Sequence, residues 1–520
     1  MQLRYIKTVQ PPTKQFNKVA AVCWSNNYRK LAIADWDGQV HLFDENGERR
    51  DKFPTKSASG KRGNYVIKGM AFSPDDYRLA IAQSDDIVFV YKLGLEWGEK
   101  KSICNKFPQT SSVTSICWPH LRANEVVFGT IEGKVKIGNL RTNKGGTLYS
   151  TDSPVISLCS SPDGNGLVSG HMDGSIYRFY FQEIEGEQNL VGVQKIAQHT
   201  SAPQCITWAE SIFATGQDKR VTCYGRDGAV QQHFDFANIK DEKEFSAITN
   251  SPSGQSVIVG SFNRMRLFNF NSRRAMWEEG EVYDIPNMYS VTAMAWKPDG
   301  SRLAIGSLCG AVDLYDTCIK RYRYKGEFEF TYVSSFQVIV RRISTGTRIV
   351  LKSLYGYEIL KVNVARNQYL AAFTTKTLLL GDLDSCKLSE VPWIVSNKEK
   401  FVFDNPRVCL VFNAGEMSII EYGINDVIGN FRTEHITPNL ISVRISYPPE
   451  MDGGNHTIEM EGNKKVAYLI DSHTIRVLDL VSSVLRAKIN HDYKVDWLEL
   501  NSRTNKLLFR DKQRQLHLFD

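Results

Sequence analysis

The sequence contains no long hydrophobic run. None of its apolar stretches approaches the ~18 residues that a membrane-spanning helix needs. Residues 1–7 also carry charges where a secretory signal would need a continuous apolar segment. We therefore expect neither a membrane span nor a secretory signal, and we predict a cytoplasmic location.

Cysteine is too sparse for a fold held by disulfides. The 520 residues include ten cysteines, and none of them forms a Cys-x-x-Cys pair. Several lie inside apolar runs, as Cys23 and Cys117 do, where cysteine behaves as a small buried hydrophobic residue. This usage is typical of a reduced, intracellular protein.

An excess of charge of one sign is missing as well. The chain has 64 Lys and Arg against 57 Asp and Glu, a net charge of +7, and the excess is shared between residues 1–333 and 334–520. A module that holds a phosphate backbone needs a concentrated basic surface. We therefore expect no nucleic-acid partner.

The motifs of common enzymes and cofactor sites are absent from the sequence. There is no phosphate-binding Gly-x-x-x-x-Gly-Lys-Ser/Thr loop, no Gly-x-Ser-x-Gly nucleophile turn and no His-x-x-x-His pair among the ten histidines. The sequence therefore predicts no catalytic residue, no cofactor, no metal site and no small-molecule substrate. It favours a protein that is not an enzyme.

What the sequence does contain is a repeat of about 45 residues, and no convincing helical period. Short β-branched or alternating runs end at positions spaced 42 to 48 residues apart: Trp24, Phe72, Trp118, Ser160, Trp208, Asn250 and Trp296. A turn, a second strand, a two-residue turn and a third strand follow each of them. Repeats of this length with about four strands each are typical of propeller blades.

The turns of the repeat are specified by their residue types. Four repeats place Pro at the second position of the first turn, at Pro74, Pro162, Pro252 and Pro298, where its fixed φ suits the turn. The second turn is of Asp-Gly type at Asp37-Gly38 and Asp173-Gly174, which is a hairpin signal. Both turns support the strand assignment.

The repeat predicts an all-β fold of tandem β-propellers. Residues 1–333 hold seven repeats and should form a closed seven-bladed propeller, with residues 3–9 as a candidate outer strand of its last blade. Residues 334–520 continue with weaker repeats, enough for four to five blades of a second propeller. We therefore expect the second propeller to be incomplete within this chain, and the chain to be a fragment.

Partner contacts are expected at aromatic and basic residues of loops and edges, since Trp, Tyr and Arg dominate interface energetics. Trp36 and Asp37 lie at a hairpin turn, and Trp97, Lys100 and Lys101 lie in a polar loop. Each Trp could equally pack against its own blade. The run at residues 320–325 interleaves Arg321 and Arg323 with Tyr322 and Tyr324, which fits either an anionic surface or, as we favour, a strand that buries the two tyrosines.

The repeats resemble the WD-repeat family, although strand ends read Phe43-Asp44 or Tyr315-Asp316 where that family prefers Trp-Asp. Longer stretches are similar to the large WD-repeat subunits of intraflagellar transport complex B. They include DENGERRDKF (44–53), VIKGMAFSPD (66–75), WGEKKSICNKF (97–107), STGTRIVLK (344–352), FNAGE (412–416), VDWLEL (495–500) and KLLFRD (506–511). The resemblance extends over essentially the whole chain.

This resemblance implies a non-catalytic scaffold or adaptor that binds other complex-B subunits in cilium assembly and ciliary transport. It also implies a location at the cilium or flagellum and its basal body. An alternative is a membrane-coat-like propeller module, because tandem propellers also build coats, with basic segments contacting acidic lipid.

Overall fold

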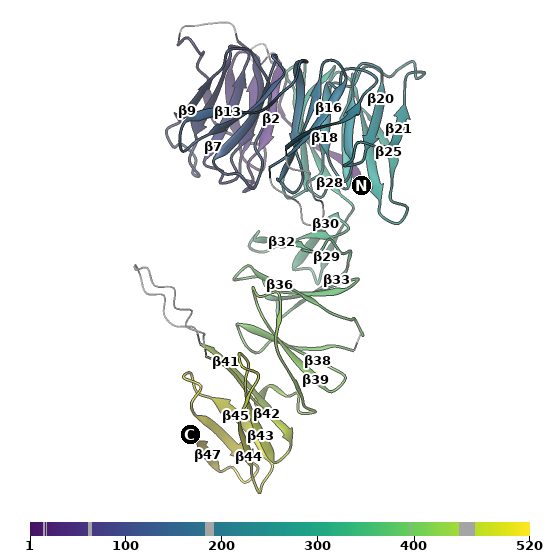
Figure 1. The fold of residues 1–520 in the computed structure, drawn as a ribbon. Coiled ribbons are helices and arrows are strands. Elements are labelled where there is room, and N and C mark those ends of the chain that lie inside the picture. The colour runs from purple at the N-terminus through teal and green to yellow at the C-terminus, as the bar shows by residue number, and fades with distance from the viewer. Residues whose placement is uncertain (14–15, 17, 61–64, 182–191, 397, 447–462) are drawn as a thin grey trace. The chain divides into compact units, whose positions relative to one another are not determined.

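A computed structural model of the chain describes residues 1–13, 16, 18–60, 65–181, 192–396, 398–446 and 463–520 (Figure 1). These residues form antiparallel sheets, most of them four-stranded, and one short 3-10 helix. The prediction of an all-β fold built from tandem blades is confirmed. The chain divides into two compact units, residues 1–321 with 331–334 and residues 322–330 with 335–520, which we describe separately.

Seven four-stranded sheets occupy the first unit. In each we name the strands A to D in order across the sheet. The first three sheets are β2 (Val19–Trp24), β3 (Leu31–Asp35), β4 (Gln39–Phe43) and β5 (Arg49–Pro54); β6 (Ile67–Phe72), β7 (Arg78–Gln83), β8 (Ile87–Lys92) and β9 (Ser102–Pro108); and β10 (Val113–Cys117), β11 (Glu125–Thr130), β12 (Lys134–Asn139) and β13 (Lys144–Ser150).

The next three sheets follow the same order. They are β14 (Val155–Ser160), β15 (Gly166–His171), β16 (Ser175–Tyr180) and β17 (Gly192–Gln198); β18 (Cys205–Trp208), β19 (Ile212–Thr215), β20 (Arg220–Tyr224) and β21 (Val230–Asp235); and β22 (Ala247–Asn250), β23 (Ser256–Gly260), β24 (Arg264–Asn271) and β25 (Met276–Asp284). The seventh sheet is β26 (Val291–Trp296), β27 (Arg302–Ser307), β28 (Val312–Cys318) and, as strand D, β1 (Gln2–Gln10).

The turn between strands A and B is held by a serine in four of these sheets. The hydroxyl oxygen of Ser73 accepts a hydrogen bond from the amide of Arg78 at 3.0 Å, and Ser161 accepts one from Gly166 at 2.8 Å. Ser25 and Ser251 make the equivalent bond. Because the side chain replaces a missing backbone partner, the serine fixes the turn independently of what the sheet packs against.

Burial falls mainly on strands B and C, and strand D faces solvent. All five residues of β3 are buried, whereas four of the six residues of β5 are exposed. A sheet that is buried on both faces needs a neighbour on each side. The A strands accordingly lie against one another in the order β2, β6, β10, β14, β18, β22 and β26, and β26 lies against β2 again.

The ring is joined where the first and seventh sheets meet. The buried Lys297 places its ammonium 5.8 Å from the ring centre of Trp24 and 3.1 Å from the carboxylate of Asp299. Arg302 donates a hydrogen bond to the backbone oxygen of Glu45. The contacts of Lys297 with Trp24 and of Arg302 with Glu45 connect residues that are more than 250 positions apart in sequence.

Strand β1 also connects the two ends of the first unit. It pairs antiparallel with β28, from Gln2 opposite Cys318 to Gln10 opposite Val312. The prediction that residues 3–9 supply the outer strand of the last blade is thereby confirmed. Leu3 points inward and is 7% exposed, and its amide donates to the hydroxyl of Tyr283 at 2.9 Å.

Five further sheets follow, and the boundary between the two units falls within the first of them. Their strands are β29 (Lys320–Tyr324), β30 (Phe328–Ser334), β31 (Gln337–Arg342) and β32 (Arg348–Lys352); β33 (Ile359–Ala365), β34 (Tyr369–Thr374), β35 (Thr377–Asp382) and β36 (Lys387–Pro392); and β37 (Lys400–Val402), β38 (Val408–Asn413), β39 (Glu416–Glu421) and β40 (Val427–Arg432).

The helix η1 (Pro438–Leu440) precedes the last two sheets. These are β41 (Ile441–Ser446), β42 (Asn463–Asp471), β43 (Thr474–Asp479) and β44 (Leu485–Asn490), and β45 (Val495–Leu500), β46 (Leu507–Asp511) and β47 (Leu516–Phe519). From the sheet of β33 onward, each sheet packs on the next through buried apolar side chains.

We predict that Leu3→Ala destabilises the first unit. The substitution leaves a cavity where β1 meets the core, which costs about 2 to 3 kcal/mol and lowers the melting temperature. Ile6→Ala is the matched control, because Ile6 lies on the same strand but is 41% exposed. Equal losses in thermal unfolding of the two variants would show that β1 does not contribute to the core.

Candidate protein-interaction face

The turn between strands B and C projects one side chain outward in the first sheet. Asp35, the last residue of β3, accepts hydrogen bonds on Oδ1 from the amides of Asp37 at 3.0 Å and Gln39 at 2.8 Å. Gly38 takes a φ of +76°, which a side chain would strain. Trp36, the first residue after β3, lies in this turn and is 46% exposed.

The same position carries an exposed apolar residue in four other sheets of the first unit. The exposed fractions are 52% for Ile131, 61% for Met172, 41% for Phe262 and 41% for Leu308. The corresponding residues of the remaining two sheets are polar, Ser84 and Gln217. We call the five apolar residues, with Trp36 included, the BC-turn ring.

The residue before each member of the BC-turn ring explains why the ring is exposed. These preceding residues are small or polar, are buried and bond within their own turn: Asp35, Thr130, His171, Ser261 and Ser307. Thr130, for example, accepts the amide of Lys134 at 3.3 Å. Because that residue faces inward, the next one faces solvent.

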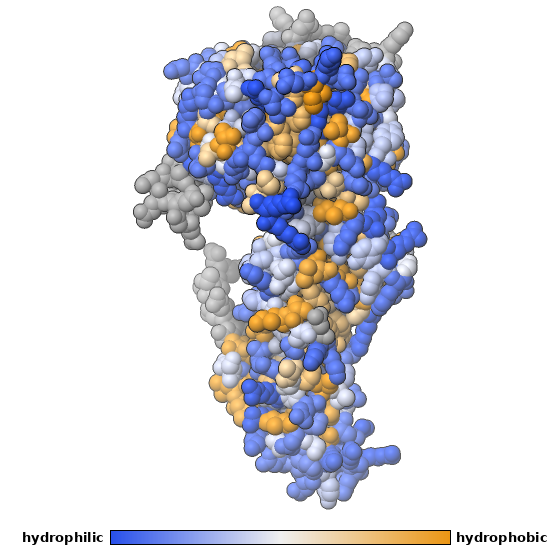
Figure 2. All heavy atoms as spheres, turned by 90° about the vertical axis from the view of Figure 1, so that its right-hand side faces the viewer, coloured by the Kyte–Doolittle hydropathy of each residue, from blue (hydrophilic) through white to orange (hydrophobic). Residues whose placement is uncertain are grey.

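Carboxylates accompany the apolar residues in three of these turns. Asp37, Glu132 and Asp173 each follow directly after a ring residue and are exposed. Glu132 forms an ion pair with Lys134 at 2.7 Å. Three of the five ring residues therefore have a carboxylate directly after them. On the side of the molecule shown in Figure 2, hydrophobic residues are likewise grouped in small patches among hydrophilic ones.

The structure separates the two loops that the sequence singles out. Trp36 follows the end of β3, whereas Trp97 packs on Lys30, directly before the start of β3, with the ammonium 5.1 Å from the ring centre. Lys30 also donates to the backbone oxygen of Gly94 at 2.8 Å. Trp36 with Asp37 and Trp97 with its neighbours thus lie at opposite ends of the strands.

The lysines beside Trp97 differ in their surroundings. Lys101 forms an ion pair with Asp51 and its side chain is 13% exposed, whereas Lys100 is exposed. Lys18 lies over the ring of Trp36 at the same distance of 5.1 Å, so each tryptophan has a lysine over its ring, and both stay predicted partner contacts. Lys100 stays a predicted partner contact.

The basic run at residues 320–325 does not bury both tyrosines. Tyr322 is 39% exposed, so the expectation that it is buried is wrong. The reason is that β29 is the edge strand of its sheet, in which β30 is its neighbour on one side; Phe330 of β30 lies 5.5 Å from Tyr322 between ring centres. Tyr324, which stacks on the same ring at 5.1 Å, is partly buried.

The two arginines of this run are both exposed, and one of them is engaged in the fold. Arg321 donates to the carboxylate of Asp316 at 2.9 Å and to the hydroxyl of Thr331 at 3.1 Å. Arg323 is exposed on the same strand. The ion pair leaves Arg321 less available to an anionic surface than the sequence suggests.

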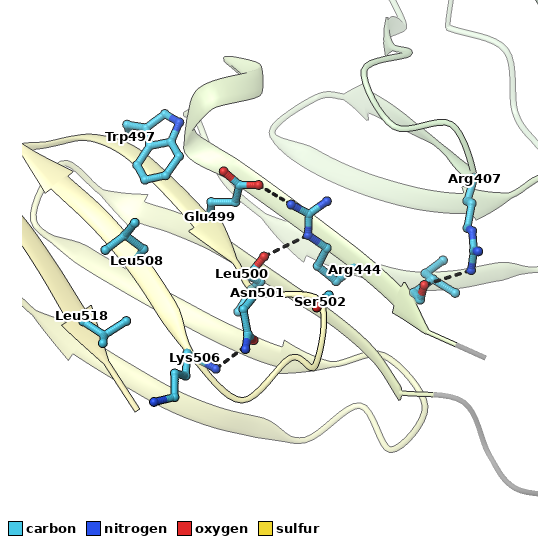
Figure 3. Close-up of a pocket in the computed structure, with 11 residues that line it drawn as sticks. Arg407, Arg444, Trp497, Glu499, Leu500, Asn501, Ser502, Lys506, Leu508 and Leu518 are labelled. Carbon is cyan, nitrogen blue, oxygen red and sulfur yellow. Dashed lines mark hydrogen bonds and ion pairs between the residues drawn. The ribbon is translucent and has the colours of Figure 1, made fainter. Parts of the chain in front are cut away.

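The second unit contains a hollow of about 720 Å³ beside the sheet of β45 to β47 (Figure 3). Figure 3 shows Trp497, Leu508 and Leu518 along one side of it. Arg444 donates to the backbone oxygen of Leu500 at 2.9 Å and pairs with Glu499, so its charge is already neutralised. Arg407 and Lys506 also line the hollow, so its walls are both apolar and polar.

Sequence reasoning missed one cluster of chemically capable residues. His491, Asp511 and His517 bring three potential metal ligands within 4.8 Å of one another. They are spread over residues 491–517, so no local motif marks them. The only available signal is the six-residue spacing of Asp511 and His517, which Asp35 and His41 share.

Comparison with known proteins agrees with this architecture. The family model for the WD domain, G-beta repeat, matches residues 6–44 and 143–179. Intraflagellar transport protein 172 of Chlamydomonas reinhardtii is 51% identical and its homologue in Homo sapiens is 47% identical, each over 100% of this chain. The chain is homologous over its whole length to part of intraflagellar transport protein 172. The resemblance predicted from the sequence is confirmed.

A more distant relative supports the same assignment. Intraflagellar transport protein osm-1 of Caenorhabditis elegans is 38% identical over 100% of the chain. The chain spans 29% of the length of these three relatives. No helix among the described residues has the length and apolar character needed to cross a membrane.

We predict that His171, the buried residue directly before Met172, makes the first unit less stable in acid. Its Nδ1–H donates to the backbone oxygen of Ser153 at 2.9 Å, and its Nε2 accepts the hydroxyl of Ser169 at 2.8 Å. Burial lowers the pKa of His171 below its ordinary value, although the Ser153 bond and Asp173 oppose the shift. His171 therefore binds a proton more readily in the unfolded chain than in the folded chain.

The free energy of unfolding should fall as pH drops from about 7 to about 5, by at most about 1.4 kcal/mol per pH unit for this group. His171→Gln should reduce that slope in denaturant titrations. His233→Gln is the control, because His233 is exposed on β21. An unchanged slope in His171→Gln would exclude His171 as the cause.

Proposed function

We propose that this chain acts as a non-catalytic scaffold of the intraflagellar transport machinery and that it binds other complex-B subunits through the BC-turn ring. The names of its relatives support the transport role. The observation that carries the binding role is the exposed apolar residue at one equivalent turn position in five of seven sheets. A location at the cilium or flagellum and its basal body, after synthesis in the cytoplasm, follows from this role.

The side chains of the ring indicate what kind of partner surface fits. Trp36, Met172 and Phe262 are large and supply contact area, which suits anchors in an interface. Asp37 and Asp173 beside them would attract lysine or arginine. We infer a partner surface in which apolar side chains are flanked by basic ones, so that binding weakens as salt rises.

The lipid-binding alternative has less support. An acidic membrane attracts clustered cations, whereas carboxylates follow three residues of the BC-turn ring and Arg321 is paired with Asp316. Flotation of the purified chain with phosphatidylserine vesicles separates the two functions. Salt-sensitive flotation without any protein partner would favour the lipid role.

We predict that the double variant Trp36→Ser with Met172→Ser loses partner binding but keeps its stability. Both side chains are exposed, so their removal costs the fold little, whereas the loss of two interface anchors should weaken binding at least about tenfold. The measurement is capture of complex-B subunits from ciliated-cell extract by the immobilised chain, together with the melting temperature.

Val230→Ser serves as the control for this variant. Val230 is 62% exposed but lies on the outer strand β21, away from the BC turns. Capture should be unchanged in Val230→Ser. If the double variant captures complex-B subunits as well as the unaltered chain does, the BC-turn ring is not the binding surface.

A further inference from the structure

The sheet of β45 to β47 holds two imidazoles around one carboxylate oxygen. His491 lies in the connection between β44 and β45, Asp511 ends β46, and His517 lies on β47. The Nε2 atoms of His491 and His517 are 3.2 Å and 3.0 Å from the same atom, Oδ2 of Asp511. Three separate segments of the chain therefore converge on one point.

Asp511 is fully buried, and both of its carboxylate oxygens have hydrogen-bond partners. The Gln515 amide donates to Oδ1 at 3.0 Å, which leaves Oδ2 to the two imidazoles. Oδ2 is therefore the atom on which the two histidines converge.

Neighbouring aromatic and backbone groups orient both rings. Phe509 stacks on His517 at 5.0 Å between ring centres and meets His491 edge-on at 5.3 Å. The amide of His491 donates to the backbone oxygen of His473 at 2.9 Å. The side chains of His491 and His517 are still 17% and 31% exposed, so solvent can reach the cluster.

The distances suit a small divalent ion. Zinc holds nitrogen and oxygen ligands at about 2.0 to 2.2 Å in a tetrahedron, which places neighbouring ligand atoms about 3.3 Å apart. The two nitrogen–oxygen distances in the cluster, 3.2 Å and 3.0 Å, are close to that value, and all three ligand atoms lie within 4.8 Å of one another, so a small movement of the rings would bring them around one ion. Imidazole and carboxylate are also a ligand set that zinc accepts, with a fourth position open to water.

The first unit provides an internal comparison. Asp35 and His41 have the same spacing, and Nε2 of His41 lies 3.1 Å from Oδ2 of Asp35. The place beside His41 is taken by Phe16, at 4.8 Å between ring centres, whereas His491 lies 4.4 Å from His517. One aspartate and one histidine are thus enough to link the two strands of such a hairpin. The second histidine of the other cluster requires a separate explanation.

We propose that His491, Asp511 and His517 form a binding site for a divalent transition-metal ion of the zinc type, with water as the fourth ligand. Without the ion, Asp511 accepts the Nε2–H of both rings. On binding, the proton on each Nε2 moves to Nδ1 of the same ring, which frees Nε2 as a ligand.

The test is isothermal titration calorimetry of the 520-residue chain with Zn²⁺ alone. Metals are first removed from the chain with a chelator. Co²⁺ serves as a second probe, because its visible absorption distinguishes tetrahedral nitrogen and oxygen ligands from cysteine sulfur. We expect one ion per chain. His491→Gln and His517→Gln should each weaken binding at least about tenfold, and His41→Gln should leave it unchanged.

Glutamine is chosen because its amide can still donate to Asp511, so each variant retains the hydrogen bond that ties the hairpin. Thermal unfolding without metal verifies that the variants are folded, and if one of them fails to fold, the other decides. Equal Zn²⁺ affinity in the unaltered chain and in His491→Gln or His517→Gln would overturn the proposal, since it would assign the ion to other side chains.

Discussion

The first unit depends on the pairing of its first strand with its last sheet. Strand B of each sheet is buried on both faces, so a sheet gains most of its stability from its two neighbours. A ring satisfies this need for every sheet at once and leaves no unpaired inner edge. Strand β1 supplies the fourth strand of the seventh sheet, so the ends of the ring are joined by backbone hydrogen bonds as well as by packing.

Because the stability comes mainly from the packed strands, the turns can differ in sequence. The A-to-B turns repeat one serine device, whereas the B-to-C turns carry Trp, Ile, Met, Phe and Leu at a position that contributes little to the core. Binding residues are expected on such turns, where a rigid scaffold holds them in place. A regular fold and an irregular surface therefore come from the same repeat.

Much of the fold could be predicted from the sequence, because turn chemistry and strand periodicity are local. Pro74 and Asp37-Gly38 each specify a turn, and residues 3–9 alternate as an edge strand does. The sites could not be predicted in the same way. Trp36 and Trp97 look alike in sequence but lie at opposite ends of the strands, and Tyr322 is exposed because β29 is an edge strand. Only the sheet order decides such questions.

The two aspartate–histidine hairpins show how a repeated structural device can acquire chemistry. Asp35 and Asp511 both hold a turn with one carboxylate oxygen and a histidine of strand C with the other. The two pairs differ in the residue that the connection before the sheet places beside the histidine. Phe16 adds only apolar contact to the pair with His41, whereas His491 adds a third ligand atom to the same carboxylate oxygen that His517 contacts. A single side-chain difference at an equivalent place therefore separates a hydrogen-bonded turn from a site with the ligands for a metal ion.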